Sequence, residues 1–132
     1  MSLVDRPEFL RTVLLVDAVT CVATGALMTV GADFVSSLTQ IPKGLLMAAG
    51  LSLFPIAAVI AFVATRRPLL RTGVWLVIIG NVGWVLGSVL VMVTGSITPN
   101  THGYAFIITQ AVAVAILAEL ELTGLRRART AA

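Results

Sequence analysis

The chain has 132 residues, of which 58% are hydrophobic and only 11% are charged, and its formal net charge is +3. A soluble domain carries about 25% charged residues, so this composition excludes an ordinary soluble protein and predicts a membrane protein. The single cysteine, Cys21, excludes an intrachain disulfide and a cysteine metal cluster.

Four apolar runs predict four membrane-spanning helices. They cover residues 12–32, 44–65, 72–94 and 104–124. Each run is close to the ~20 residues that a helix needs to cross the hydrocarbon layer. Little of the chain lies outside them, so we predict an all-α bundle of four transmembrane helices that forms one domain over residues 1–132.

The first run carries a charge at membrane depth. Asp17 shares a helical face with Thr20, Cys21 and Thr24. A carboxylate in lipid is costly, so this face is expected to turn toward other helices or a cavity. Two hypotheses follow: Asp17 binds a ligand, a proton or an ion, or it bonds to polar neighbours or an arginine and only fixes helix packing.

The second run is preceded by an apolar connection and interrupted by a proline. Phe34, Leu38 and Ile41 recur at near-helical spacing, which fits either a short interfacial helix over residues 33–41 or an apolar loop. Pro55, near the middle of the second run, removes one backbone hydrogen bond and predicts a kink or a cavity there.

The third run has two distinct faces. Asn81, Trp84 and Ser88 share one of them, and Trp84 is too deep for an interfacial anchor, so we expect it to fill the bundle interior or line a pocket. Gly83 and Gly87 form a Gly-x-x-x-Gly pair on the neighbouring face. This pair predicts a close crossing with another helix, in the same chain or in a second one.

The fourth run carries Gln110, Glu119 and Glu121. Gln110 and Glu121 share a face, whereas Glu119 points nearly opposite, so one glutamate is expected to face the bundle. Glu119 lies close to the depth of Asp17, and the two could share a proton if the first and fourth helices adjoin. Alternatively, both glutamates pair with arginines at the interface. His102, the only histidine, lies before this run and is expected to be a solvated loop residue rather than a metal ligand.

The basic residues predict the orientation. All the arginines lie before the first run, between the second and third, or after the fourth, and only Lys43 lies on the other side. The positive-inside rule then places both termini in the cytoplasm. The arginines are Arg6, Arg11, Arg66, Arg67, Arg71, Arg126, Arg127 and Arg129.

Two resemblances accompany these patterns. Four short helices with an acid in the first resemble the architecture of small multidrug-resistance transporters. The segments Val-Asp-Ala-Val (16–19), Phe-Pro (54–55), Asn-Val-Gly-Trp (81–84) and Ala-Glu-Leu-Glu (118–121) resemble uncharacterised small four-helix bacterial membrane proteins. The second resemblance implies a location in the bacterial inner membrane and no particular activity.

The sequence contains no motif for catalysis, phosphate binding, a metal or a cofactor, so we expect neither an enzyme nor a nucleic-acid partner. One hypothesis is a bundle that binds or moves a small lipophilic or cationic ligand. Its site would be drawn from Asp17, Thr20, Thr24, Asn81, Trp84, Gln110 and Glu119. The other hypothesis is an accessory or scaffold subunit, which joins a homo-oligomer or a larger membrane complex through its glycine and alanine faces.

Overall fold

The computed structural model describes residues 7–131 and their side chains as far as residue 128; Arg6 and the side chain of Arg129 lie outside this part. It contains the helices α1 (Pro7–Val30), α2 (Ala32–Thr39), α3 (Lys43–Thr65), α4 (Arg71–Val93) and α5 (Thr101–Ala131). α1, α3, α4 and α5 are each long and apolar enough to cross a membrane. The predictions of an all-α chain and of four helices of spanning length are confirmed.

Two of the long helices extend beyond the apolar runs from which they were predicted. α1 begins at Pro7, a residue suited to the first turn of a helix, and α5 continues past residue 124 to Ala131. Hydropathy marks where a helix can contact lipid, whereas leucine, alanine and arginine continue it into the polar zone. The connection before α3 is helical as well, so of the two alternatives for residues 33–41 the short helix is the one that forms.

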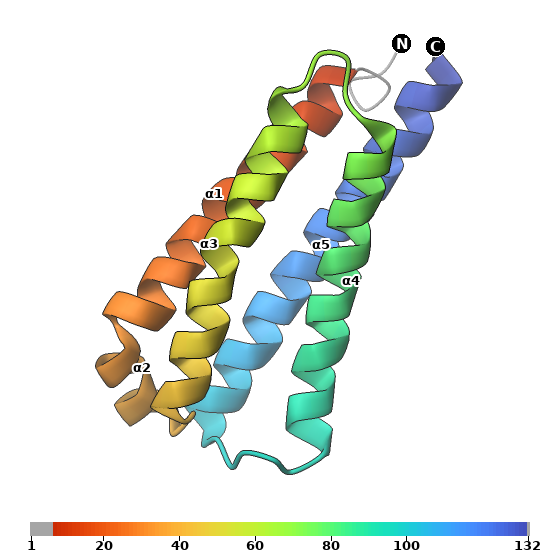
Figure 1. Ribbon diagram of the computed structural model, residues 1–132. Helices are drawn as coiled ribbons and strands as arrows, with labels where there is room; N and C mark the ends of the chain where they lie inside the picture. The colour runs from red at the N-terminus through yellow and green to blue at the C-terminus, as the bar shows by residue number, and fades with distance from the viewer. Residues whose placement is uncertain (1–6, 132) are drawn as a thin grey trace.

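The four long helices are arranged as two pairs (Figure 1). α1 packs extensively along α3, and α4 packs along α5; α1 and α5 join the two pairs, while α3 and α4 touch little. The start of α1, the end of α5 and the α3–α4 turn lie at one end of the bundle, which we call the arginine-rich end. α2 and the α4–α5 connection lie at the opposite end, here called the α2 end.

Hydrogen bonds from Asn100 and an ion pair with Lys43 hold α2 against the starts of α5 and α3. The Asn100 side chain donates to the carbonyl oxygen of Leu38 (2.8 Å), and its backbone N–H donates to that of Thr39 (3.1 Å). Lys43 forms an ion pair with Asp33 at 2.8 Å. These contacts hold α2 between the start of α3 and the start of α5.

Arg11 ties α1 to the end of α3. Its Nη1 donates to the carbonyl oxygens of Ala64 and Arg66, the second at 3.1 Å. The last carbonyls of a helix have no partner within it and carry partial negative charge, so a guanidinium is well placed there. Glu8 lies 3.7 Å from Arg11 and 3.6 Å from Arg67, so this arginine is engaged at the helix end and not with the carboxylate of Asp17.

Two glycines allow α1 and α3 to approach closely. A Cβ atom built on Gly50 would lie 2.9 Å from Met28 Cβ and from Thr29 Cγ2, and one on Gly25 would lie 2.9 Å from the Gly50 carbonyl oxygen. In lipid, where helices gain little from burying apolar surface, such close backbone contact is a main source of attraction. The α1–α3 pair is therefore the tightest part of the bundle.

The Gly83–Gly87 pair does not form a close crossing within this chain. A Cβ built on either residue meets nothing within 4 Å, and the same is true of Gly80. The prediction of a close crossing in the same chain is wrong, because these glycines border a cavity between the helices and no neighbouring backbone approaches them. The part of that prediction that concerns a second chain is untouched.

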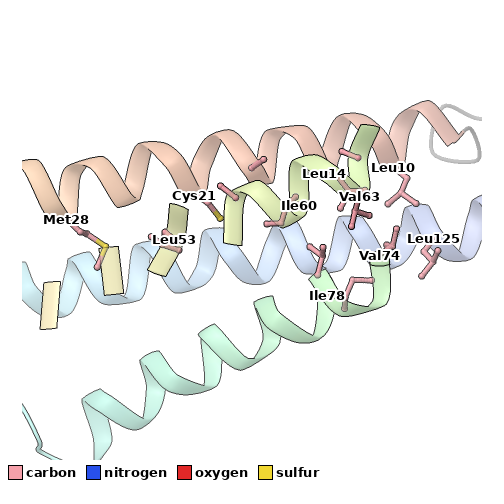
Figure 2. Packing of buried hydrophobic residues seen from close by; sticks show 14 of the residues in the cluster. Leu10, Leu14, Cys21, Met28, Leu53, Ile60, Val63, Val74, Ile78 and Leu125 are labelled. Atoms are coloured by element: carbon pink, nitrogen blue, oxygen red, sulfur yellow. The ribbon is translucent and has the colours of Figure 1, made fainter. Parts of the chain in front are cut away.

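The apolar core is concentrated toward the arginine-rich end (Figure 2). There Leu10 and Leu14 of α1, Val63 of α3, Val74 of α4 and Leu125 of α5 pack together. α4 contributes buried residues only as far as Asn81. Beyond Asn81 the helix has no fully buried side chain, so the interior opens from that level toward the α2 end.

We predict that Gly50→Ala destabilises the protein by about 1–3 kcal/mol, because the added methyl group must displace well-packed atoms of α1. Gly83→Ala is the matched control on α4 and should leave stability within about 0.5 kcal/mol. Reversible unfolding in mixed detergent micelles measures both changes. Equal effects of the two substitutions would contradict the assignment of the tight crossing to α1 and α3.

Candidate functional site

Three polar side chains from three helices meet inside the bundle. They are Asp17 of α1, Asn81 of α4 and Glu121 of α5, and their exposed fractions are 1%, 7% and 0%. Each lies well inside a helix of spanning length. We call Asp17 and Glu121 the carboxyl pair.

The Asn81 amide bridges the carboxyl pair. Its Nδ2 donates to Asp17 Oδ2 at 2.7 Å and to Glu121 Oε1 at 2.9 Å. An amide nitrogen carries two hydrogens, so both donors are used. The Cys21 thiol adds a weaker donor, with its sulfur 3.7 Å from Asp17 Oδ1.

The two carboxyl groups are close neighbours, because both accept hydrogen bonds from the same Asn81 nitrogen. Two ionised carboxylates this close repel each other, and a proton on one of them removes the repulsion. Glu121 Oε2 is buried with no hydrogen-bond partner among the described residues, so a negative charge on this oxygen has no donor to stabilise it.

Glu8 and Asp33 form ion pairs at the ends of the helices, away from the carboxyl pair. Arg71 Nη1 reaches the Leu125 carbonyl oxygen at 3.5 Å, one turn beyond Glu121, and Arg11 is held by the end of α3. The hydrogen bonds of the carboxyl pair therefore come from Asn81 and Cys21, not from a guanidinium.

A cavity of about 800 Å³ adjoins Asp17 and Asn81 and runs between the two helix pairs. All five helices contribute to its walls, which are mainly apolar. Pro55 of α3 lies in the wall, as expected for a proline beside a cavity, and α3 nonetheless continues unbroken across it. Phe34 and His102 line the cavity near the α2 end, so it extends from the carboxyl pair to that end. Glu121 does not line the cavity and lies behind Asp17 and Asn81.

A second polar group lies in the cavity wall beyond Asn81. Trp84 Nε1 donates to Gln110 Oε1 at 2.6 Å, and Gln110 Nε2 donates to Ser88 Oγ at 3.0 Å. Trp84 and Gln110 also line a smaller cavity of about 390 Å³, together with Gly83 and Gly87. The Trp84–Gln110 pair therefore separates two hollow regions of the bundle.

Six of the seven predicted site residues lie at the larger cavity, and the seventh, Glu119, does not. Asp17, Thr20, Thr24, Asn81, Trp84 and Gln110 all line the larger cavity. Glu119, expected near Asp17, lies instead on the exposed face of α5. Glu121 takes its place, because two residues correspond to about 200° of rotation on a helix and only one of the two glutamates can face inward.

The sequence contains one indication that Glu121, and not Glu119, faces the interior of the bundle. It shares a helical face with Gln110, and both side chains point into the bundle. Depth along the helix favoured Glu119, but the direction of the side chain decides which groups meet. His102 was expected to be a solvated loop residue; it is exposed, but it is the second residue of α5 and lines the cavity. In the described part of the chain, no group of three histidine, cysteine or acidic side chains is arranged to hold a metal ion.

A scan against models of protein families gives no match, and searches of curated proteins and of solved structures find none that is significantly similar. The resemblance to small four-helix bacterial membrane proteins therefore stays a prediction. The argument for function rests on the carboxyl pair and the cavity alone.

We predict that Asn81→Ala lowers the free energy of unfolding by about 3 kcal/mol, because it removes two hydrogen bonds to buried carboxyl groups. Trp84→Phe removes one neutral hydrogen bond from a half-buried pair and should cost about 1 kcal/mol. Unfolding curves in mixed micelles compare the two variants. An Asn81→Ala variant as stable as the wild type would show that the amide does not hold the carboxyl pair.

Proposed function

We propose that the protein binds a small lipophilic monovalent cation in the larger cavity, with Asp17 as its counter-ion. The observation that carries this proposal is the position of Asp17, which is 1% exposed and yet lines a cavity of about 800 Å³. A buried carboxylate inside a membrane needs either a partner of opposite charge or a proton. The cavity provides space for such a partner.

The charge of the preferred ligand follows from the carboxyl pair. Asp17 and Glu121 lie too close to be ionised together at low cost, so the pair carries one net negative charge when it holds a single proton. A monovalent cation neutralises that charge, whereas a neutral molecule leaves it uncompensated.

The size and polarity of the ligand follow from the cavity walls. Ligand sites of proteins commonly measure about 300–1,000 Å³, with apolar walls and a few polar groups that fix orientation. Here the polar groups are the carboxyl pair with Asn81, and the Trp84–Gln110 pair farther along. A cationic head at Asp17 with an apolar body toward Trp84 and Phe34 fits this distribution.

The route of entry is expected to be lateral. α3 and α4 touch little, and both line the cavity. An amphiphile dissolved in the bilayer could therefore reach Asp17 between these two helices without crossing the polar ends of the bundle.

The experiment uses octylamine, which is a cation at neutral pH, and octan-1-ol, its neutral counterpart. In lipid nanodiscs, octylamine should raise the unfolding temperature of the wild type and change the fluorescence of Trp84, measured in a Trp75→Phe background. Asp17→Asn should weaken octylamine binding about tenfold or more, because one charge-assisted hydrogen bond is worth about 1.5–3 kcal/mol. Glu119→Gln, on the exposed face of α5, is the matched control and should bind as the wild type does.

Equal binding of octylamine and octan-1-ol, or equal binding by Asp17→Asn and the wild type, would rule the proposal out. The alternative hypothesis of a scaffold subunit would then be favoured, with Gly83 and Gly87, which no atom of this chain approaches within 4 Å of a built Cβ, as the place where a second helix could dock. In that case Gly83→Leu should release a partner or change the oligomeric state.

We also propose that both termini lie in the cytoplasm. Arg11, Arg66, Arg67 and Arg71 all lie at the arginine-rich end, whereas Lys43 at the α2 end is paired with Asp33. This asymmetry supports insertion with the arginine-rich end inward.

Single cysteines at two exposed positions test the orientation. In intact bacterial cells a membrane-impermeant maleimide should label Thr98→Cys, in the α4–α5 connection, but label Arg67→Cys only after lysis. The wild type, whose Cys21 is buried, should stay unlabelled in both conditions. The reverse pattern would mean the opposite orientation, and labelling of both variants in intact cells would mean insertion in both directions.

A further inference from the structure

We infer that the carboxyl pair is a cation–proton exchange site, in which Glu121 keeps one proton and Asp17 alternates between a bound cation and a second proton. This inference rests on the proposed function and adds the chemistry by which the site is emptied. It follows from the geometry of three side chains and from the cavity beside one of them.

The two carboxyl groups have different access to the cavity. Asp17 lines it, whereas Glu121 is 0% exposed and lies outside its walls. Both accept from the same Asn81 nitrogen, at 2.7 and 2.9 Å. Asp17 is therefore the group that meets a ligand, and Glu121 is the group whose proton is sheltered from it.

The buried Oε2 of Glu121 is consistent with a retained proton. It has no hydrogen-bond partner among the described residues, and the Asp17 carboxyl group accepts from the same Asn81 nitrogen as Glu121 does. A charged carboxylate oxygen that is buried without a donor is unfavourable, whereas a proton on Glu121 removes that charge. One proton between the two groups therefore removes the repulsion between two negative charges.

The described groups that hydrogen-bond to the carboxyl pair are neutral. α1 supplies the Cys21 thiol and α4 supplies the Asn81 amide. The α3 residues in the cavity wall are apolar. Arg11 and Arg71 bind backbone carbonyls of α3 and α5, and His102 lies near the other end of the cavity.

Electrical neutrality then links the cation to a proton. With one proton and no ligand, the pair holds one negative charge in a region of low dielectric constant, which is unfavourable. A bound monovalent cation removes the charge, and so does a second proton on Asp17. When the cation enters, the O–H bond of Asp17 breaks, the proton passes to solvent water and the carboxylate pairs with the cation; when the cation leaves, a proton from solvent water returns to the same oxygen.

The first test determines whether Glu121 holds a proton, and it is carried out without any ligand. Infrared spectra of the protein in nanodiscs at neutral pH should contain the C=O band of a protonated carboxyl group. Glu121→Gln should remove that band, and Glu119→Gln should leave it intact. A wild type without the band, or a band that Glu119→Gln removes instead, would overturn the inference.

The second test counts protons during binding. Calorimetric titration with octylamine in two buffers of different ionisation enthalpy gives the number of protons released per ligand bound. Between about pH 5 and pH 8 octylamine stays protonated, because alkylammonium groups such as that of lysine titrate near 10.4, so any released proton comes from the protein. The number should rise from near zero to about one as the pH falls, and the dissociation constant should rise about tenfold per pH unit over the same range.

The outcomes separate the two proposals. Octylamine binding with no proton release at any pH would overturn the exchange while leaving the proposed function in place. Absence of octylamine binding would overturn the proposed function and the exchange together, and the infrared band would still decide whether Glu121 carries a proton.

Discussion

The side-chain amide of Asn81 is the contact on which the rest of the bundle interior depends. In lipid, a polar group without a partner cannot turn to water, so each of the three polar side chains at this level must find its bonds within the protein. Nδ2 of Asn81 connects α4 to α1 and to α5 at once. This single contact fixes the rotation of α4 and α5 about their axes, because a large turn of α4 would expose the Asn81 amide and a large turn of α5 would expose Glu121.

The same contact explains where the cavity begins. On the arginine-rich side of Asn81, leucine and valine side chains of all four long helices fill the core. On the other side, α1 and α3 stay in close contact through Gly25 and Gly50, but α4 offers only glycines and half-buried side chains. The interior is therefore packed against α4 on one side of the carboxyl pair and hollow beside α4 on the other.

Much of this fold could be predicted because hydropathy and spacing report on single helices. The four spans follow from length and composition, and the polar face of α1 follows from the period of the helix. The bonded partners of Asp17 were harder to predict, because they depend on how three helices are rotated against one another. Glu119 and Glu121 differ little in depth and almost completely in direction, and only the packing of α5 against α1 selects between them.

The glycines also show that a pattern within one helix does not predict which helices come into contact. The Gly83–Gly87 spacing is recognisable within one helix, yet the close crossing uses Gly25 of α1 and Gly50 of α3, which carry no shared motif. A crossing needs one small residue from each partner at the same level, and that level is set by loop lengths and by α2. A pattern along one helix therefore indicates that close approach is permitted, not that it occurs.

The position of Asp17 is what distinguishes a functional reading of the polar cluster from a structural one. A polar group that serves only to set helix register works best when enclosed on all sides, because closure strengthens its hydrogen bonds and keeps lipid and water away. Glu121 meets that condition, being 0% exposed and outside the cavity wall. Asp17 is almost as fully buried, at 1% exposed, but it also belongs to the wall of a largely apolar cavity of about 800 Å³. A leucine or alanine at this wall would create no charge, whereas a carboxylate inside a spanning helix needs either a proton or a partner of opposite charge.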